Sequence, residues 1–205
     1  EVSDQALAFL LAFSRRIFPV AQAVRDGLWK AGSKGMEKAR GKMLRLTEQT
    51  LGIVGVGRIG GRLALKARGF GLRVLGYDPY LSAEELQARG VEKVDFAQLL
   101  REAGREAPLL EEAGPERVLA LLLARAPGWP IGPGDVEEAL VVARKAVELR
   151  PDYPPNQVAL GEAWLKNDDR AKARDALARA IDLAGKPPSS SDPDAPSWIA
   201  EIDTP

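Results

Sequence analysis

The fold of this chain is decided by residues 50–60, which read TLGIVGVGRIG. The stretch begins as a short apolar run with β-branched residues, and this composition predicts a buried strand. It ends in three glycines with the spacing G-x-G-x-x-G, at Gly55, Gly57 and Gly60. Residues 58–69 then carry apolar side chains at helical spacing. The stretch therefore predicts a strand, a tight glycine turn and a helix in succession.

Each of the three positions in this motif requires glycine for a physical reason. One makes the tight turn, the next lets the backbone approach a pyrophosphate, and the last lets the helix pack on the strand. The N-terminus of the helix then presents free N–H groups and the positive end of its dipole to the phosphates. The spacing alone is a weak signal, because glycines also serve tight packing between a helix and a strand.

An acidic residue stands where a dinucleotide site needs one. Residues 72–77 predict a second buried strand, and Asp78 follows it directly, 18 residues after Gly60. At this place a carboxylate accepts both ribose hydroxyls of NAD and repels the extra phosphate of NADP. With strand, glycine turn, helix and carboxylate in register, the sequence predicts dinucleotide-binding ancestry.

The rest of the first half is predicted to be mostly helical. Leucines spaced three and four apart predict a helix over residues 4–30, with Ser3 or Asp4 as its N-cap and a kink or restart at Pro19. Residues 31–41 are rich in Gly, Ser and Lys and are expected to form a solvated connection. The first strand is predicted over residues 49–56. After the second strand, a helix is predicted from Ser82 to Gly90, with Ser82 and Glu85 as its capping box. A third strand over 91–94 and a helix from Asp95 to about Ala103 follow.

The composition excludes several kinds of chemistry. The chain has 205 residues, with 29 Lys and Arg, 29 Asp and Glu, no Cys and no His. A net charge of zero gives no global attraction to nucleic acid. The absence of Cys excludes disulfides and thiolate sites, and the absence of His removes the commonest general acid or base. We predict no catalytic residue, no metal site and no nucleic-acid partner.

No membrane partner is predicted either. The longest apolar run, Ala6 to Phe13, is far shorter than the roughly 20 residues that a spanning helix needs. No targeting segment is visible, so a cytoplasmic location is expected. The chain opens with Glu1 in place of Met and enters a helical pattern at once, which indicates a start cut inside a larger pattern.

Three stretches resemble one known family, the NAD-binding domain of D-isomer-specific 2-hydroxyacid dehydrogenases, with the C-terminal-binding-protein branch closest in character. They are residues 1–7 with Arg15-Arg16-Ile17, residues 50–60, and residues 74–80 (VLGYDPY). The resemblance covers about residues 1–102. It implies that Arg58 and Ile59 contact the pyrophosphate, that Asp78 contacts the adenosine ribose, and that the N-terminal helix contributes to a homodimer.

The departure from that family matters as much as the match. By the resemblance, the catalytic Arg, Glu and His come later in the chain, beyond a fourth strand, and nothing of the kind follows Gly104. Ordinary 2-hydroxyacid dehydrogenase activity is therefore not expected. Without the fourth strand, the edge of residues 51–56 is left unpaired. The helices of the second half, a second copy of the chain or partial disorder would have to account for it.

From Gly104 onward the strand signals stop and a helical repeat begins. Alanines and leucines recur 34 residues apart, at Ala139 and Ala173, Ala146 and Ala180, and Leu149 and Leu183. Such small residues let helices pack closely while neighbouring pairs stack. The period, with Gly161 in the first helix of the last pair, resembles tetratricopeptide repeats over residues 106–184. That resemblance implies binding of a peptide or protein surface.

The predicted elements of the second half are nearly all helices. They are a helix over 106–126 broken at Gly114-Pro115, a rigid loop over 127–134, a helix capped by Asp135 and ending at Arg150, and a helical hairpin over 156–167 and 170–184. The tail from Gly185 is a Pro, Ser and Asp linker, with Trp198 and Ile199 as its only apolar anchors.

Several residue groups have both a functional and a structural interpretation, and we favour the structural one for each. We interpret three aromatic residues as packing residues and not as ligand contacts: Trp129, Tyr153 and Trp164. We interpret the charges over 168–174 as a solvated face and not as a clamp for a peptide carboxylate. We also interpret a basic stretch as solvated and not as a phosphate site: Lys34, Lys38, Arg40, Lys42 and Arg45. The pairs Glu111-Glu112 and Glu137-Glu138 point about 100° apart on a helix, so neither is expected to hold a metal.

These observations predict an α/β fold followed by an all-α part, with a partial Rossmann-like parallel sheet of two or three strands before tetratricopeptide-like hairpins. The expected domains are a truncated dinucleotide-binding half over 1–103, a helical module over 104–184 and a flexible tail over 185–205. The first hypothesis is a non-catalytic composite, natural or artificial, with a vestigial NAD half-site and a protein-binding module. The alternative is a NAD-binding oxidoreductase or NAD sensor whose helical half completes the site.

Overall fold

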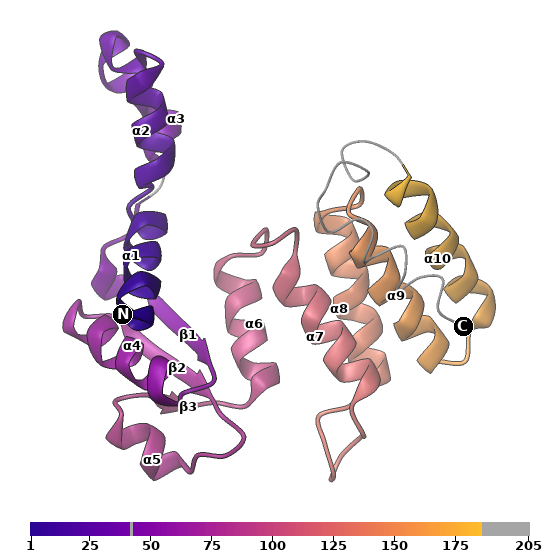
Figure 1. Cartoon of the computed structure of the whole chain (residues 1–205). Helices are drawn as coiled ribbons and strands as arrows, with labels where there is room; N and C mark the ends of the chain where they lie inside the picture. Colours follow the sequence, from indigo (N-terminus) through magenta and orange to yellow (C-terminus); the bar gives the residue numbers. More distant parts are fainter. Residues whose placement is uncertain (42, 186–205) are drawn as a thin grey trace. The chain divides into compact units, whose positions relative to one another are not determined.

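The computed structural model describes residues 1–41 and 43–185 (Figure 1). Lys42 and the predicted tail beyond Gly185 lie outside the described residues. The chain divides into two compact units, Glu1–Phe96 and a second unit that begins at Ala97. The first holds a parallel sheet, and the described part of the second, up to Gly185, consists of helices and their connections, as the sequence predicted.

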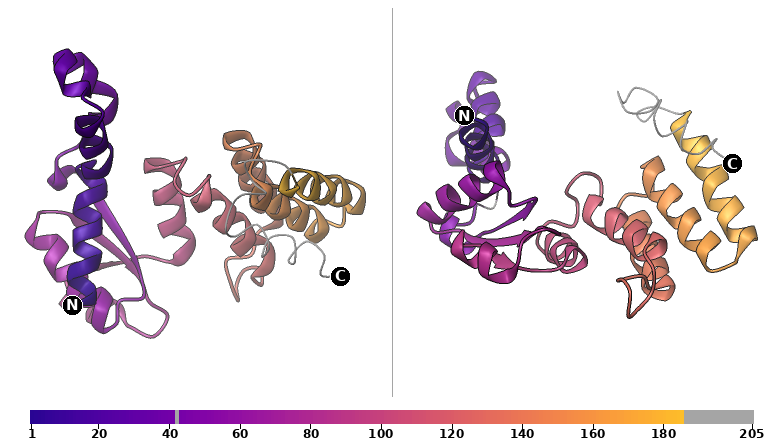
Figure 2. Two further views of the ribbon diagram at one scale, coloured as in Figure 1. Left: turned by 45° about the horizontal axis from the view of Figure 1, so that its top comes forward. Right: turned by 60° about the horizontal axis from the view of Figure 1, so that its bottom comes forward.

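The sheet of the first unit has three parallel strands in the order β1-β2-β3. The strands are β1 (Thr50–Val54), β2 (Arg73–Tyr77) and β3 (Glu92–Lys93). Between β1 and β2 runs α4 (Arg58–Gly69), whose bounds match the prediction. Figure 2 shows the strands side by side with α4 against them. The arrangement confirms the partial Rossmann-like sheet.

The core of this unit lies between the sheet and α4. Ile53 and Val74 from the strands pack with Ala64 and Ala67 of α4, and all four are buried. The two alanines bring the helix close to the sheet because they have only a methyl group to bury. The strand edge next to this core, on the outer side of β1, has no partner strand among the described residues.

The N-terminal helix predicted over 4–30 is divided into shorter pieces: α1 (Val2–Ser14), α2 (Ile17–Arg25) and the 3₁₀ turn η1 (Leu28–Ala31). The break falls at Arg16, whose φ of 52° is left-handed, so the helix restarts two residues before Pro19. The predicted N-cap at Ser3 or Asp4 is wrong. Ser3 lies inside α1 and accepts a hydrogen bond of 2.7 Å from Lys66 Nζ on α4.

The expected solvated connection over 31–41 is also wrong, because it contains the helix α3 (Gly32–Arg40). Its Met36 side chain is buried, and Arg16 Nε donates a hydrogen bond of 2.9 Å to the carbonyl of Ala39. The burial of Met36 and the hydrogen bond from Arg16, at the α1–α2 junction, outweigh the poor helix propensity of the glycines. A further 3₁₀ turn, η2 (Leu46–Glu48), leads into β1.

After β2 the chain follows the prediction closely. Ser82 Oγ accepts from the N–H of Glu85, and the Glu85 carboxylate accepts from the N–H of Ser82, which is the predicted capping box of α5 (Ala83–Ala88). Gly90, with a φ of 72°, turns the chain after this helix into β3. The helix α6 (Phe96–Glu106) follows, and Phe96 stacks on Tyr77 with ring centroids 5.3 Å apart.

The second unit continues with four helices, α7 (Gly114–Arg125), α8 (Val136–Leu149), α9 (Pro154–Lys166) and α10 (Arg170–Ala184). The repeated alanines of α8 and α10 are buried, as the 34-residue spacing predicted. A Cβ on Gly161 would lie 2.8 Å from Leu177, so α9 and α10 pack closely at this glycine. Gly114-Pro115 begins α7 and does not interrupt a longer helix, because residues 108–113 form turns.

Within the part of the chain that the structure describes, no single helix combines the length and apolar composition that a bilayer-spanning helix needs. Only α1 and α2 taken together, across a 60° bend, meet that test.

Candidate functional site

The glycine turn between β1 and α4 has the geometry that its spacing predicts. Gly55 has a φ of 84°, which favours glycine. A Cβ on Gly60 would lie 2.1 Å from the carbonyl oxygen of Gly55, so only glycine lets α4 pack against the turn. A Cβ on Gly57 would meet nothing within 4 Å. The backbone at Gly57 therefore faces open space.

The N-terminus of α4 is available to an anion. Gly57 is the N-cap residue, and it offers no side chain to the first N–H groups of the helix. Arg58 and Ile59, which follow it, are exposed. Unsatisfied N–H groups and the positive end of the helix dipole attract phosphate groups to such a position.

Asp78 lies at the end of β2 and reaches back to the glycine turn. Its side chain is only 8 % exposed, and its two oxygens accept hydrogen bonds of 2.9 Å from the N–H groups of Val56 and Tyr80. The hydrogen bond from Tyr80, followed by that from Val56 and the charge of Arg89, lowers the pKa of Asp78 against the opposing effect of burial. The carboxylate is therefore ionised at neutral pH.

Arg89 is a residue of this site that the sequence analysis missed. Its guanidinium donates a hydrogen bond to the carbonyl of Val56, the residue whose own N–H donates to Asp78. Its side chain also passes Gly61, where a Cβ would lie 3.5 Å from the Arg89 Cδ. An arginine after a short capped helix carries no motif, so only the three-dimensional contact identifies it.

These residues line an open pocket of about 530 Å³ beside the glycine turn. Its lining residues are Gly57, Arg58, Gly61, Arg62, Asp78, Tyr80, Leu81 and Arg89. Three of the six predicted cofactor residues, Gly57, Arg58 and Asp78, thus share one pocket. Gly55 and Gly60 form the turn behind it, and Ile59 lies outside this lining. The pocket contains three arginines and one aspartate.

The donor set fits a dinucleotide. The N-terminus of α4 and Arg58 would hold the pyrophosphate, and the Asp78 carboxylate would accept ribose hydroxyls. When bound, NAD supplies a hydride acceptor. Hydride transfer to or from a hydroxy acid also needs a group that moves the hydroxyl proton, and histidine, the usual choice, is absent from the sequence. Among the described residues, no group of three acidic side chains is placed to hold a metal ion.

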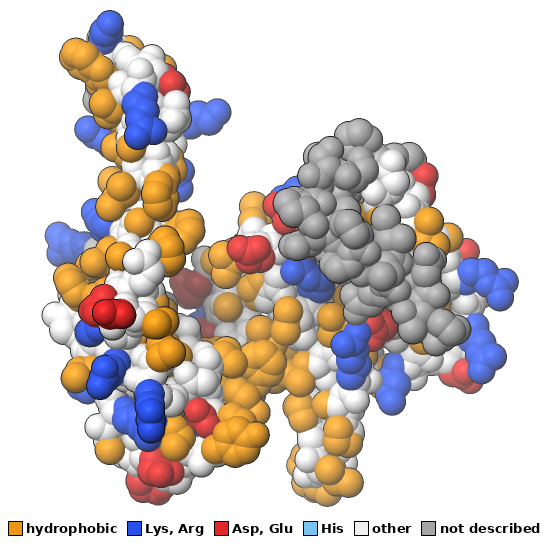
Figure 3. All heavy atoms as spheres, viewed as in Figure 1, with side chains coloured by type: hydrophobic (Ala, Val, Ile, Leu, Met, Phe, Trp, Pro, Cys, Tyr) orange, Lys and Arg blue, Asp and Glu red, His pale blue; other side chains and the backbone are white. Residues whose placement is uncertain are grey.

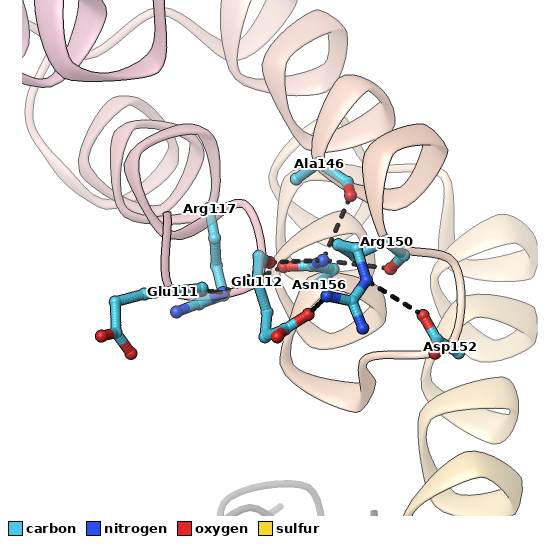
Figure 4. Close-up of polar contacts among 7 residues, drawn as sticks. All are labelled: Glu111, Glu112, Arg117, Ala146, Arg150, Asp152 and Asn156. Atoms are coloured by element: carbon cyan, nitrogen blue, oxygen red, sulfur yellow. Dashed lines mark hydrogen bonds and ion pairs between the residues drawn. The ribbon is translucent and has the colours of Figure 1, made fainter. Parts of the chain in front are cut away.

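The second unit contains a buried polar network centred on Asn156 (Figure 4). The Asn156 side chain is fully buried, and its Nδ2 donates hydrogen bonds of 3.1 Å to three carbonyls, those of Glu112, Ala146 and Arg150. Its Oδ1 accepts a hydrogen bond of 3.1 Å from Arg117. The network joins the C-terminal end of α8, the start of α9 and the turn before α7.

The same network corrects the interpretation of one acidic pair. Glu111 and Glu112 are not on a helix: they have φ angles of 48° and 57°, and Ala113 follows with 65°. Arg117 donates to the carbonyls of both glutamates, and the Glu112 carboxylate pairs with Arg150. The turn therefore serves to build the helical unit. On α8, Glu138 pairs with Arg101 at 2.9 Å.

The three aromatic residues of this unit have different environments. Trp164 is buried, and Arg144 Cζ and Lys172 Nζ lie over its ring, 4.8 Å and 4.3 Å from the centroid. Tyr153 is half-buried under Arg117. The packing interpretation is wrong for Trp129, which is 90 % exposed at the tip of the 127–134 loop.

That loop is closed by hydrogen bonds of its own backbone. The N–H of Gly134 donates to the carbonyl of Pro127 at 2.8 Å, and Gly128 and Gly134 form a bridge. Ile131, also at the tip, is 83 % exposed. In Figure 3 the loop between α7 and α8 projects as a narrow extension with hydrophobic side chains at its end.

The predicted charged face over 168–174 is solvated, as expected. Arg170, Lys172 and Arg174 are exposed, and Lys172 pairs with Asp169 at 2.7 Å. In the first unit, the described members of the basic stretch, Lys34, Lys38, Arg40 and Arg45, are exposed too.

Comparison with protein families finds two matches in this chain. Residues 7–104 match the NAD binding domain of D-isomer specific 2-hydroxyacid dehydrogenases. Residues 131–189 match a tetratricopeptide repeat. Both resemblances inferred from the motifs are confirmed at the level of the family, while the C-terminal-binding-protein branch stays a prediction. The dehydrogenase match includes β1, α4 and β2 with the pocket beside them.

Curated relatives match about half of the chain. Over 101 residues, 49 % of this chain, it is 42 % identical to a glyoxylate reductase of Thermococcus litoralis, of which it covers 30 %. It is 39 % identical over 115 residues, 54 % of the chain, to a glyoxylate reductase of Korarchaeum cryptofilum, of which it covers 33 %. It is 34 % identical over 94 residues, 46 % of the chain, to a D-3-phosphoglycerate dehydrogenase of Methanocaldococcus jannaschii, of which it covers 17 %.

The chain thus spans a third or less of the length of these relatives. It joins a segment that matches the NAD binding domain of D-isomer specific 2-hydroxyacid dehydrogenases to a segment that matches a tetratricopeptide repeat.

Proposed function

We propose that this chain is a non-catalytic composite, in which the first unit binds NAD and the helical unit binds a protein or peptide. The observation that carries the NAD part is the pocket in which the glycine turn, the N-terminus of α4 and the Asp78 carboxylate meet. The absence of histidine from the sequence supports the non-catalytic part. The proposed domains are a dinucleotide-binding half over residues 1–103, a helical module over 104–184 and a tail over 185–205. We also propose that the protein is located in the cytoplasm.

The NAD part is tested by titrating the chain with NADH and following binding by calorimetry. We expect saturable binding that Asp78→Ala abolishes, because the ribose hydroxyls lose their acceptor. Asp26→Ala makes the same change on the exposed C-terminal end of α2 and should leave binding unchanged. If NADH does not bind at any concentration at which the chain stays folded, the proposed half-site does not bind the dinucleotide.

A second candidate function is that of an NAD-dependent oxidoreductase or an NAD sensor. The observation that favours it is the 42 % identity to a protein named glyoxylate reductase. Incubation of the chain with NADH and glyoxylate, followed by NADH absorbance, distinguishes the two. Our proposal expects no loss of absorbance beyond a control with the Asp78→Ala variant, whereas steady turnover would establish the oxidoreductase.

The protein-binding part is supported by the tetratricopeptide match and by the exposed tip of the 127–134 loop. Peptides selected for binding to the chain would provide defined ligands. We expect the double substitution Trp129→Ala and Ile131→Ala to weaken the binding of a selected peptide, because both side chains are almost fully exposed and can contact a ligand. Val141→Ala, at an exposed position of α8, is the matched control.

A homodimer is the remaining part of the proposal. It is supported by large apolar side chains that are at least half exposed on α1 and α2, at Phe9, Phe13, Ile17 and Phe18. Light scattering after size exclusion should give twice the chain mass. Replacement of Phe13 and Phe18 by Ser should yield a monomer, while Leu65→Ser, an exposed change on α4, should not.

A further inference from the structure

The order of the strands limits how much of a dinucleotide the first unit can bind. In doubly wound folds, two mononucleotide-binding halves meet where the strand order reverses, and the dinucleotide lies across that crevice. In the described part of this chain the sheet runs β1-β2-β3 in one direction, and β1 is at its edge. The first unit therefore provides one mononucleotide-binding half.

The pocket lining agrees with a single half-site. Every lining residue comes from α4 with its preceding turn or from the segment between β2 and β3. These segments supply backbone donors and arginines for phosphate groups, and one carboxylate for a ribose. No lining residue comes from the far side of β1.

The charges of the pocket fit a diphosphate. Arg58, Arg62 and Arg89 face a single carboxylate, Asp78, so the lining has an excess of two positive charges. A nucleoside diphosphate carries two or more negative charges on its phosphates and presents a ribose diol to the carboxylate. Adenosine diphosphate, alone or as part of a larger molecule, carries both a diphosphate and a ribose diol.

The turn itself is fixed before any ligand arrives. Asp78 holds the N–H of Val56 and Arg89 holds its carbonyl. Two residues that line the pocket therefore set the conformation of the residue between Gly55 and Gly57. This preorganisation reduces the cost of ordering the turn around the phosphates.

From this geometry we propose that the site recognises the ADP moiety alone, so that ADP-ribose binds as tightly as NAD and the nicotinamide ring adds no affinity. The proposal rests on the proposed NAD binding, because it concerns the same pocket. It extends the ligand class to ADP and to adenine nucleotides that carry an ADP group with a free ribose diol.

The experiment is calorimetry of the full chain with NAD, ADP-ribose, ADP, 2′-deoxy-ADP and AMP. We expect the Kd values of NAD and ADP-ribose to agree within about threefold, a difference below 1 kcal/mol. AMP should bind at least about tenfold more weakly because it lacks the second phosphate, and 2′-deoxy-ADP should lose a similar factor because Asp78 loses one hydroxyl.

Tighter binding of NAD than of ADP-ribose, by more than about threefold, would overturn the proposal, since the nicotinamide half would then contribute to affinity. Failure of both ligands to bind would instead refute the proposed NAD site itself. The two failures are thus distinguishable.

Two variants separate the contacts. Arg62→Ala should weaken ADP more than AMP, because Arg62 lines the pocket as a phosphate-attracting charge. Asp78→Asn should weaken ADP-ribose and NAD by the same factor and leave their ratio unchanged. Arg25→Ala, on exposed α2, is the matched arginine control and should alter no Kd. A change in the ratio of NAD to ADP-ribose affinity in Asp78→Asn would contradict the single half-site.

Discussion

At the scale of single residues, Asn156 contributes most clearly to the fold of the second unit. Three successive residues without glycine, Glu111 to Ala113, adopt left-handed backbone angles, each of which costs about 1 kcal/mol. Donors from Asn156 and Arg117 satisfy the carbonyls of Glu111 and Glu112. The hydrogen bonds thus compensate for a turn that backbone preferences oppose.

Asn156→Ala should therefore destabilise the second unit by about 3 kcal/mol, because three carbonyls and one guanidinium lose a buried partner. Urea unfolding followed by circular dichroism measures the loss. Asn167→Ala, at the exposed C-terminal end of α9, should cost less than about 0.5 kcal/mol. Equal effects of the two substitutions would show that the buried network adds nothing to the free energy of unfolding.

Asp78 makes the stability of the first unit depend on pH. Its pKa is lowered in the folded state, chiefly by the N–H of Tyr80. The stabilisation is therefore fully present above the ordinary carboxylate pKa of about 4 and is lost as pH falls through the lowered value. The difference in unfolding free energy between the wild type and Asp78→Asn should be constant above about pH 5 and shrink at lower pH. Val54→Ala, which removes no titrating group, should show a difference independent of pH.

At the scale of elements, the sequence predicts the bounds of a helix best where residues close to its end determine them. The bounds of α4 and the capping box of α5 follow from a glycine turn and from Ser82 with Glu85, which act within a few residues. The helix α3 was missed because its stability comes from Met36 burial and from Arg16, which is far away in sequence. Arg89 was missed for the same reason, since its partner Val56 precedes it by 33 residues.

The packing of α4 on the glycine turn gives a prediction at this scale. Gly60→Ala should destabilise the first unit by about 2–3 kcal/mol, because the new Cβ would lie 2.1 Å from a backbone oxygen. Gly69→Ala, on the same helix, meets nothing within 4 Å and should leave stability unchanged or raise it by up to about 1 kcal/mol. Thermal unfolding of the two variants checks both signs, and a tolerated Gly60→Ala would mean that the turn can shift away from α4.

At the scale of the whole molecule, the two units have separate hydrophobic cores. One is built around Ile53, Val74 and α4, and the other around Leu123, Ala143 and Trp164. The pocket is lined by residues of the first unit only. A ligand that binds the pocket stabilises the folded first unit by mass action, because it contacts the lining residues of that unit.

Saturating ADP-ribose should therefore slow hydrogen exchange in β1, α4 and β2 while α8, α9 and α10 exchange at their original rates. At about 100 times the Kd, the first unit should gain about 2.7 kcal/mol, which corresponds to about a hundredfold slower exchange through global opening. Hydrogen exchange read out by mass spectrometry resolves the two units in one experiment. Slower exchange in both units would mean that they unfold together, so that the repeat helices take part in ligand binding through a shared cooperative transition.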